Sequence, residues 1–231
     1  MKILAIETAT EFCSVALLID DQLLLRSEFA PRRHAELLLP MCDAVLAEAG
    51  IARNQLDAVA VGRGPGAFTG VRLGVSAAQG IALGVDCPAI AVSSLAALAE
   101  AAPYGGGSIL AVIDARMGEI YAATFIRDNI WGVQLVGRET VGPASLVDLP
   151  ADAACVVGSG WAAYEAVLAG RMEQSPAYSD GQRFPQADAV ARLARPLFTV
   201  GNVLDPADLQ PVYLRDNVAL TIDQQRNSRL P

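Results

Sequence analysis

A strand-like sequence occurs twice in this chain, once at its start and once near its middle. Residues 3–7 read ILAIE and residues 109–114 read ILAVID, so the copies are offset by about 106 residues. A repeat unit of this size is too long for a solenoid, whose units span roughly 20–50 residues. The duplication therefore predicts two similar α/β lobes that meet at a cleft. We place them at residues 1–104 and 105–220, with residues 221–231 as a polar tail whose composition is typical of disorder.

Hydrophobic periodicity predicts the same order of elements in both halves, three strands followed by alternating helices and strands. Pro103 and the glycines at 105–107 are typical of a linker between the halves. In the first half we predict strands at 2–6, 14–19, 23–29, 58–61 and 89–92, and helices at 34–49, 70–83 and 94–101. In the second half we predict strands at 109–114, 119–126, 131–139 and 154–157, and helices at 161–169 and 186–198.

Composition limits the partners that this chain can bind alone. Its 231 residues are 53% apolar and only 18% charged, and its 25 acidic residues outnumber its 17 lysines and arginines. Because nucleic-acid affinity depends on neutralising phosphates, an acidic chain without a basic stripe is not expected to grip RNA or DNA by itself. The cysteines are widely spaced, which predicts buried thiols in a reducing compartment; they are Cys13, Cys42, Cys87 and Cys155.

The sequence also bears on localisation. Glu7 interrupts the N-terminal apolar run too early for a signal peptide. The longest weakly charged stretch, residues 73–85, is too short to cross a bilayer and contains Gln79. We therefore predict a soluble cytoplasmic protein.

Glycines are concentrated where the strand at 58–61 leads into the next helix. A glycine inside a helix costs roughly 1 kcal/mol of stability relative to alanine. Several glycines in one helix therefore indicate that the helix backbone must lie very close to another group; here they are Gly70, Gly74, Gly80 and Gly84. A phosphate and another helix are the two candidates. No lysine follows these glycines and their spacing departs from G-x-G-x-x-G, so both common phosphate-binding motifs fail. The local interpretation is a tight turn with Thr69 as N-cap, followed by a helix that packs closely on a partner helix.

The helix predicted at residues 34–49 has a wider apolar arc than a one-sided surface helix needs. One row contains Leu38, Met41, Val45 and Ala49, and a second row contains Ala35, Leu39, Cys42 and Leu46. The second row therefore predicts a partner surface. Pro40 fits either the first turn of this helix or a kink, because it lacks a backbone donor.

Several motifs, spread over nearly the whole chain, resemble a known family. Residues 5–10 (AIETAT), within a duplicated β-β-β-α-β-α pattern, resemble the actin, sugar kinase and Hsp70 (ASKHA) superfamily. Residues 64–74 (GPGAFTGVRLG), 114–121 (DARMGEIY) and 211–215 (PVYLR) narrow the resemblance to the TsaB family, formerly YeaZ. The resemblance implies an α/β fold with two ASKHA-like lobes.

The same resemblance implies a function. TsaB proteins resemble the catalytic protein TsaD and act as its partner in making threonylcarbamoyladenosine next to the anticodon of tRNAs that read ANN codons. The ATPase TsaE and the threonylcarbamoyl-adenylate made by TsaC complete the pathway. The implied role is a scaffold that forms a heterodimer with TsaD and a homodimer when alone. It would meet tRNA only within the complex, with ATP and metal carried by TsaD and TsaE and no membrane involved.

The residues themselves agree with a missing active site. The first phosphate loop of the superfamily has an aspartate and a glycine where Glu7 and Ala9 stand here, so we expect Glu7, Thr8, Ala9 and Thr10 to form a degenerate loop. The longer side chain displaces the carboxylate, and a Cβ at position 9 blocks backbone approach to phosphate. TsaD binds its metal through two histidines four residues apart on a helix. Here His34 is the only histidine and Leu38 follows it, so no metal site and no catalytic residue are predicted.

Two helices are expected to form the surface for TsaD, and self-pairing would use the same surface. The predicted interface residues are His34, Leu38, Leu39, Met41, Cys42, Val45, Leu46, Thr69, Gly70, Arg72, Leu73, Gly74, Ser76 and Ala77.

Two alternatives stay open at this point. The chain could be an ATP-hydrolysing enzyme or a peptidase acting on TsaD, for which Thr8, Thr10 and Ser14 are the available hydroxyls. It could also complete a nucleotide or tRNA site once bound to its partner, with phosphate contacts from arginines; the candidates are Arg63, Arg72 and Arg116.

Overall fold

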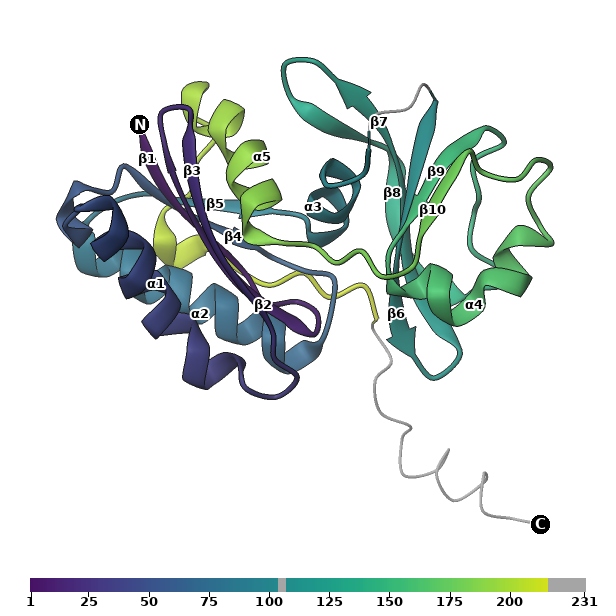
Figure 1. Cartoon of the computed structure of the whole chain (residues 1–231), viewed down its shortest axis with the longest axis horizontal. Helices are drawn as coiled ribbons and strands as arrows, with labels where there is room; N and C mark the ends of the chain where they lie inside the picture. The colour runs from purple at the N-terminus through teal and green to yellow at the C-terminus, as the bar shows by residue number, and fades with distance from the viewer. Residues whose placement is uncertain (104–106, 216–231) are drawn as a thin grey trace, which may run out of the picture.

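The computed structural model describes residues 1–103 and 107–215, which form two α/β lobes, each built on a five-stranded sheet (Figure 1). Gly105 and Gly106 of the predicted linker, and the predicted tail, lie outside the described residues. The first lobe comprises β1 (Lys2–Glu7), β2 (Phe12–Ile19), β3 (Gln22–Phe29), α1 (His34–Ala49), η1 (Arg53–Gln55), β4 (Ala58–Gly62), α2 (Phe68–Val85), β5 (Ala89–Val92) and α3 (Ser94–Glu100).

The second lobe repeats this architecture with fewer helices. It comprises β6 (Ser108–Arg116), β7 (Glu119–Asp128), β8 (Gly132–Pro143), β9 (Ala153–Val157), α4 (Ser159–Ala169) and β10 (Tyr178–Asp180). Helix α5 (Ala187–Thr199) and the short η2 (Pro206–Asp208) follow it in the chain. The three-residue strand β10 is too short to show a periodic pattern and was not predicted from the sequence.

Sheet topology confirms the duplication. The strand orders are β3-β2-β1-β4-β5 and β8-β7-β6-β9-β10, with β1 and β6 in equivalent central positions. In each sheet the first three strands are antiparallel and the last two run parallel to the central strand. The α/β class and the ASKHA-like arrangement expected from the motifs are therefore present. Helix α1 joins β3 to β4, whereas turns alone join β8 to β9.

Strand β1 is buried on both faces because helices cover both sides of its sheet. Leu4 and Ile6 face the cluster formed with α1 and α2, while Ile3 and Ala5 face the cluster formed with α3 and α5. Such two-sided burial explains why β1 reads as a continuous apolar run. The last residue of the strand, Glu7, points to the α3 side, where an apolar residue would be expected.

The region between the lobes is largely filled on one side. Helix α5 follows the second sheet in sequence, yet it packs on β1, β2 and β4 of the first sheet (Figure 1). One apolar cluster runs from the first sheet through α5 and α3 into β6 and β7, and it includes Ile3, Leu98, Val190, Ile109 and Phe125. The expected cleft between the lobes is therefore closed along this side by two helices.

Helix α2 differs from the prediction in two details, its first residue and its N-cap. Helix α2 begins at Phe68 with Ala67 as N-cap, and no side chain caps it, so Thr69 lies in its first turn and is not the cap. The reason is that the turn closes through the backbone, with the Ala67 N–H donating to the Ala9 carbonyl oxygen over 2.7 Å. Helix α3, in contrast, is capped by the Ser93 side chain, which accepts a hydrogen bond from the Ala96 N–H. Pro40 lies inside α1, beyond its first turn.

The prediction that the cysteine side chains are buried is confirmed. All four cysteines are free and buried. Burial raises the pKa of Cys13 to about 11 and that of Cys42 to about 12, because desolvation disfavours the thiolate. These side chains therefore serve as small apolar packing groups.

The apolar stretch that we predicted to be too short for a membrane is part of a longer helix. Helix α2 starts five residues earlier, and its 18 residues are long and apolar enough, by length and composition alone, to cross a membrane. One such helix is weak evidence, because core helices of soluble proteins pass the same test. Here α2 packs along β4 and against η2 within an α/β lobe, so it is not a clear membrane span.

Candidate functional site

The carboxyl group of Glu7 is the most unusual feature of the first lobe. It lies at the end of β1 and is fully buried. Oε1 accepts a hydrogen bond from the Ala9 N–H at 2.7 Å, and Oε2 accepts one from the Ser94 hydroxyl at 2.8 Å. Burial raises the pKa of Glu7, while the bonds from Ala9, Ser94 and the Thr8 backbone partly lower it. Among the described residues no ion pair involves this carboxyl group.

The glycine-rich segment packs against the turn that follows Glu7. A Cβ on Gly62 would lie 1.9 Å from Glu7 Oε2, and one on Gly66 would lie 2.3 Å from the Ala9 carbonyl oxygen. Cβ atoms on Gly70 and Gly74 would lie 2.1 Å from the Thr8 carbonyl oxygen and 2.4 Å from Thr8 Oγ1. These four glycines therefore allow close contact with Glu7 and the turn that follows it, and the prediction that Gly70 and Gly74 make room for a partner helix is wrong.

The hydroxyl groups of the predicted loop are engaged in structure. Thr8 Oγ1 donates to the Gly70 carbonyl oxygen at 2.8 Å. Ser14 Oγ donates to the Glu7 carbonyl oxygen at 3.3 Å and accepts from the Ala187 N–H at 3.0 Å, which ties β2 to the start of α5. Thr10 Oγ1 is buried without a hydrogen-bond partner among the described residues. Within the described part of the chain, none of these hydroxyls is hydrogen-bonded to a histidine or carboxylate side chain that could act as a base.

His34 fastens the start of α1 to the same turn. Its Nε2 lies 2.9 Å from the Thr10 carbonyl oxygen and 3.2 Å from the Phe12 carbonyl oxygen. Both neighbours are acceptors, so Nε2 carries the proton and acts as donor. No group of three or more metal-ligating side chains occurs within residues 1–103 and 107–215. A structural role for His34 follows directly from these contacts.

Helix α1 turns most of its predicted interface residues toward its own sheet. Four of them are buried in the first lobe and offer no free surface: Leu38, Cys42, Val45 and Leu46. Met41 is half-buried and packs against the same cluster, whereas Leu39 is 55% exposed. The wide apolar arc is therefore explained largely by contacts within the chain. Of the two predicted rows, Ala35 and Leu39 are exposed and Met41 and Ala49 are half-buried, so these residues are left for a partner.

Helix α2 divides its residues more evenly between core and solvent. Gly70, Val71, Gly74, Val75, Ala78 and Ala82 form its buried row. Of the remaining predicted residues, Thr69, Arg72 and Ser76 are exposed, and Leu73 and Ala77 are half-buried. Phe68 and Leu83 are also exposed, at 54% and 59%. At Gly80 and Gly84 an added Cβ would meet nothing within 4 Å, so the second half of this helix has a shallow open face.

Arg72 stacks between two exposed aromatic rings that sequence reasoning did not connect. Its guanidinium carbon lies 3.4 Å from the ring centroid of Phe68 and 5.2 Å from that of Tyr213. Arg72 Nε also donates to Tyr213 Oη at 2.5 Å. Tyr213 belongs to the PVYLR segment, whose Val212 N–H donates to the Arg63 carbonyl oxygen. The motif thus reaches the start of α2 from more than a hundred residues away.

Two other arginines pair with acidic residues across the lobes. Arg116 Nη2 lies 2.8 Å from Glu11 in the first lobe, and its Nη1 lies 2.8 Å from Asp114. Arg63 Nη2 lies 3.7 Å from Glu139 on β8, which also accepts a hydrogen bond from the Ser93 hydroxyl. These contacts match the ion-pairing role that is the default for surface arginines.

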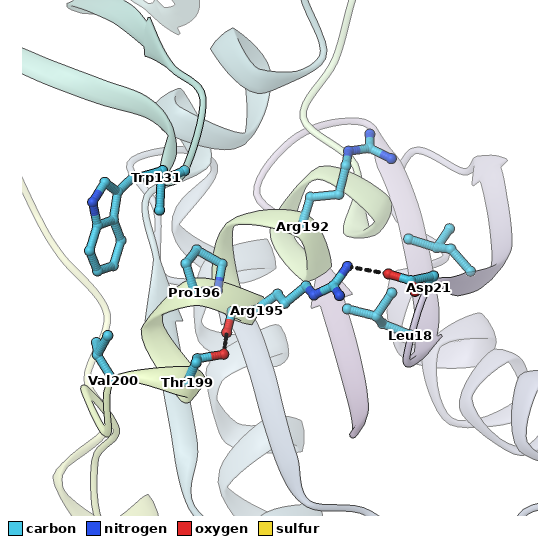
Figure 2. A pocket seen from close by; sticks show the side chains of 10 residues that line it. Leu18, Asp21, Trp131, Arg192, Arg195, Pro196, Thr199 and Val200 are labelled. Atoms are coloured by element: carbon cyan, nitrogen blue, oxygen red, sulfur yellow. Dashed lines mark hydrogen bonds and ion pairs between the residues drawn. The ribbon is translucent and has the colours of Figure 1, made fainter.

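A separate groove lies at the opposite end of β1 from Glu7, between the β2–β3 turn, the β7–β8 turn and α5. Its volume is about 600 Å³, with Trp131 on one wall and Arg192 and Arg195 on another (Figure 2). Arg195 pairs with Asp21 at 2.8 Å and Arg192 with Asp188 at 2.5 Å. Because its charges are paired and its lining residues include no nucleophile and base pair, the groove offers no evident chemistry.

Comparison with known proteins extends over both lobes. A family model described as TsaD, tRNA N6-adenosine threonylcarbamoyltransferase, matches residues 27–180. The tRNA threonylcarbamoyladenosine biosynthesis proteins TsaB of Haemophilus influenzae and Escherichia coli are 37% and 40% identical to this chain. The alignments cover 94% and 95% of this chain and 95% and 96% of those proteins. A solved structure titled YeaZ from Pseudomonas aeruginosa is 39% identical, with a TM-score of 0.82 over 92% of this chain and 99% of that chain.

Proposed function

Because this chain belongs to the TsaB family, named for tRNA threonylcarbamoyladenosine biosynthesis, we propose that it is a non-catalytic subunit that pairs with TsaD. Its membership confirms the resemblance read from the sequence motifs. The proposed assembly supports threonylcarbamoyl transfer to the adenosine next to the anticodon of tRNAs that read ANN codons. TsaD performs the transfer in this proposal.

The open face of α2 carries the proposal. This helix is apolar along most of its length, yet only six of its 18 residues are buried, all on one side. A helix with apolar residues on several sides is normally covered on those sides. Small residues at Ser76, Ala77, Gly80 and Gly84 would let a second helix approach closely, with Arg72 and Phe68 at one end of that face and Leu83 at the other. We place TsaD on this face, with Leu39 of α1 at its border.

The packing around Glu7 supports the non-catalytic part of the proposal. The turn after β1 packs against the chain's own glycine-rich segment, and the hydroxyls of Thr8 in this turn and of Ser14 on β2 are bonded to the backbone. In this proposal the chain carries no cofactor of its own, and the ATP and metal of the pathway reside on TsaD and TsaE.

The net charge of the chain and the open face of α2 bear on which partners it binds. With a net charge of −8, the chain meets tRNA only inside the assembly, where TsaE is also a partner. We further propose that two copies pair through the α2 face when TsaD is absent, so that homodimer and heterodimer compete. Four reduced, buried cysteines agree with a cytoplasmic location.

Substitution on the open face tests the pairing. In Ser76→Trp a large ring enters the row of small residues and should prevent close approach of another helix. We expect this variant to fold like the parent by circular dichroism and thermal unfolding, but to lose co-elution with TsaD and to lose tRNA modification in the reconstituted system. Light scattering of the free chain at high concentration should also shift toward monomer.

The matched control is Ala166→Trp, which places the same ring on an exposed helical position in the second lobe. It should retain TsaD binding and modification. The proposal is wrong if Ser76→Trp still binds TsaD with parental affinity, or if both variants lose binding equally.

The enzymatic alternative needs its own experiment. Titration of the isolated chain with ATP is expected to show neither micromolar binding nor turnover. Micromolar binding with turnover that Glu7→Ala abolishes would instead establish the chain as an ATP-hydrolysing enzyme. Incubation with TsaD, followed by mass measurement of both chains, tests whether this chain is a peptidase that acts on TsaD.

A further inference from the structure

We propose that the Glu7 carboxyl group is a built-in ligand of a buried carboxyl-binding nest, and that the nest accepts a small external carboxyl compound once this side chain is removed. The nest is formed by the Ala9 N–H, the Ser94 hydroxyl and the notch at Gly62. The inference concerns the interior of the first lobe and does not rest on the proposed partner role.

Hydrogen-bond geometry shows that the group is held by neutral donors. Each carboxylate oxygen has a separate donor, Ala9 N–H for Oε1 at 2.7 Å and Ser94 Oγ for Oε2 at 2.8 Å. The backbone amide of Thr8 also favours the ionised form. A backbone N–H in a turn and a hydroxyl, each donating to its own oxygen, can hold a carboxyl group in place without a cation.

The surrounding chain leaves a space of the right shape for a carboxyl group. A Cβ on Gly62 would overlap Oε2 at 1.9 Å, so β4 approaches the group only because this residue lacks a side chain. Glu7, Ser94 and the neighbouring Thr8 and Ser14 are all buried. Without the carboxyl group, the Ala9 and Ser94 donors would therefore line a buried cavity and would lose their acceptor within the chain.

The identity of the external ligand follows from the atoms that a substitution deletes. Glu7→Ala removes Cγ, Cδ and both carboxylate oxygens, which are together the heavy atoms of acetate. Acetate can restore both hydrogen bonds and the lost volume. Acetamide has nearly the same size, but it replaces one acceptor oxygen with a donor group, so it cannot accept from both donors.

Thermal unfolding of Glu7→Ala in sodium acetate tests the inference. The variant should unfold several degrees below the parent in sodium chloride, and its midpoint should rise saturably with acetate at constant ionic strength. The parent should show no such rise, because its nest is occupied. Acetamide should give at most a small part of the effect.

Two further variants separate the nest from simple cavity filling. Leu4→Ala opens a buried apolar cavity in the same strand, and it should not respond to acetate. Glu7→Ala combined with Ser94→Ala removes one donor and should lose most of the acetate response. Should Glu7→Ala fail to fold in chloride, the fraction folded by circular dichroism should increase when the chain is refolded in acetate. An equal response to acetate and acetamide, an equal response of Leu4→Ala, or no response at all would overturn the inference.

Discussion

The Ser94 hydroxyl donates a 2.8 Å hydrogen bond to Glu7 Oε2, which joins the first residue of α3 to the last residue of β1. The adjacent Ser93 caps the same helix and donates to Glu139 of the second lobe. Two consecutive serines therefore tie the start of α3 to both lobes. Because α3 and α5 fill one side of the region between the sheets, this junction lies where the two lobes meet.

The buried carboxyl group predicts a specific dependence of stability on pH. Burial raises the pKa of Glu7 above its ordinary value of 4.5, so the folded state binds this proton more tightly than the unfolded state. The stabilisation that comes from the tighter proton binding of Glu7 is fully present below about pH 4.5, and it is lost as the pH rises through the pKa of Glu7 in the folded state.

Comparison with Glu7→Gln isolates this contribution. As the pH is raised above 4.5, the parent should lose free energy of unfolding relative to Glu7→Gln, measured by urea denaturation at each pH. A stability difference between the two proteins that stays constant over this range would contradict the prediction.

Two glycines of α2 should respond oppositely to the same substitution. In Gly74→Ala the new Cβ would lie 2.4 Å from Thr8 Oγ1, so we expect a loss of about 1–3 kcal/mol in the free energy of unfolding. In Gly80→Ala the Cβ meets nothing within 4 Å, and the higher helix propensity of alanine should add up to about 1 kcal/mol. Chemical denaturation of both variants measures the contrast, and equal effects would show that packing against the β1–β2 turn is not the cause.

The stacked Arg72 should matter more for pairing than for folding. Arg72→Lys keeps the charge but loses the planar group that lies over Phe68 and bonds to Tyr213. Because the cluster is exposed, we expect a change of about 1 kcal/mol or less in the free energy of unfolding. Affinity for TsaD, measured by calorimetry, should fall at least tenfold if the cluster anchors the partner. Arg26→Lys, at an exposed pair with Glu48, is the matched control and should bind normally.

Thiol reactivity tests the packing of the four cysteines. Their burial and the raised pKa values of Cys13 and Cys42 predict that a thiol reagent at neutral pH reacts slowly with the folded chain. After unfolding in guanidinium chloride, all four thiols should react at once. Rapid reaction of any thiol in the folded chain would show that its site opens locally, and mass spectrometry of the labelled peptides would identify it.

Sequence patterns predicted much of the fold because they reflect local rules. The repeated ILAIE and ILAVID runs located two equivalent central strands, and apolar periodicity located α1 with both its boundaries. The surface that contacts a partner was harder to predict, because a helical pattern shows which residues are apolar but not which part of the protein covers them. Leu38 and Leu39 are neighbours of the same type, yet one is buried in the sheet and the other is exposed.

The glycines show the same limit from another direction. Their number in and before α2 indicated close backbone contact, but the sequence could not identify the partner. The structure places the Thr8 and Ala9 backbone against Gly70 and Gly66, although these pairs are about sixty positions apart in the sequence.

By itself the sequence determined the duplicated α/β fold and the family, because these depend on residue type and order. Only the tertiary structure decided that the Glu7 carboxyl group is enclosed by Ser94 and Gly62, and that one side of α2 is left open. Both results depend on contacts between residues that are distant along the chain, and the free energy of such contacts is set by burial and close packing in three dimensions.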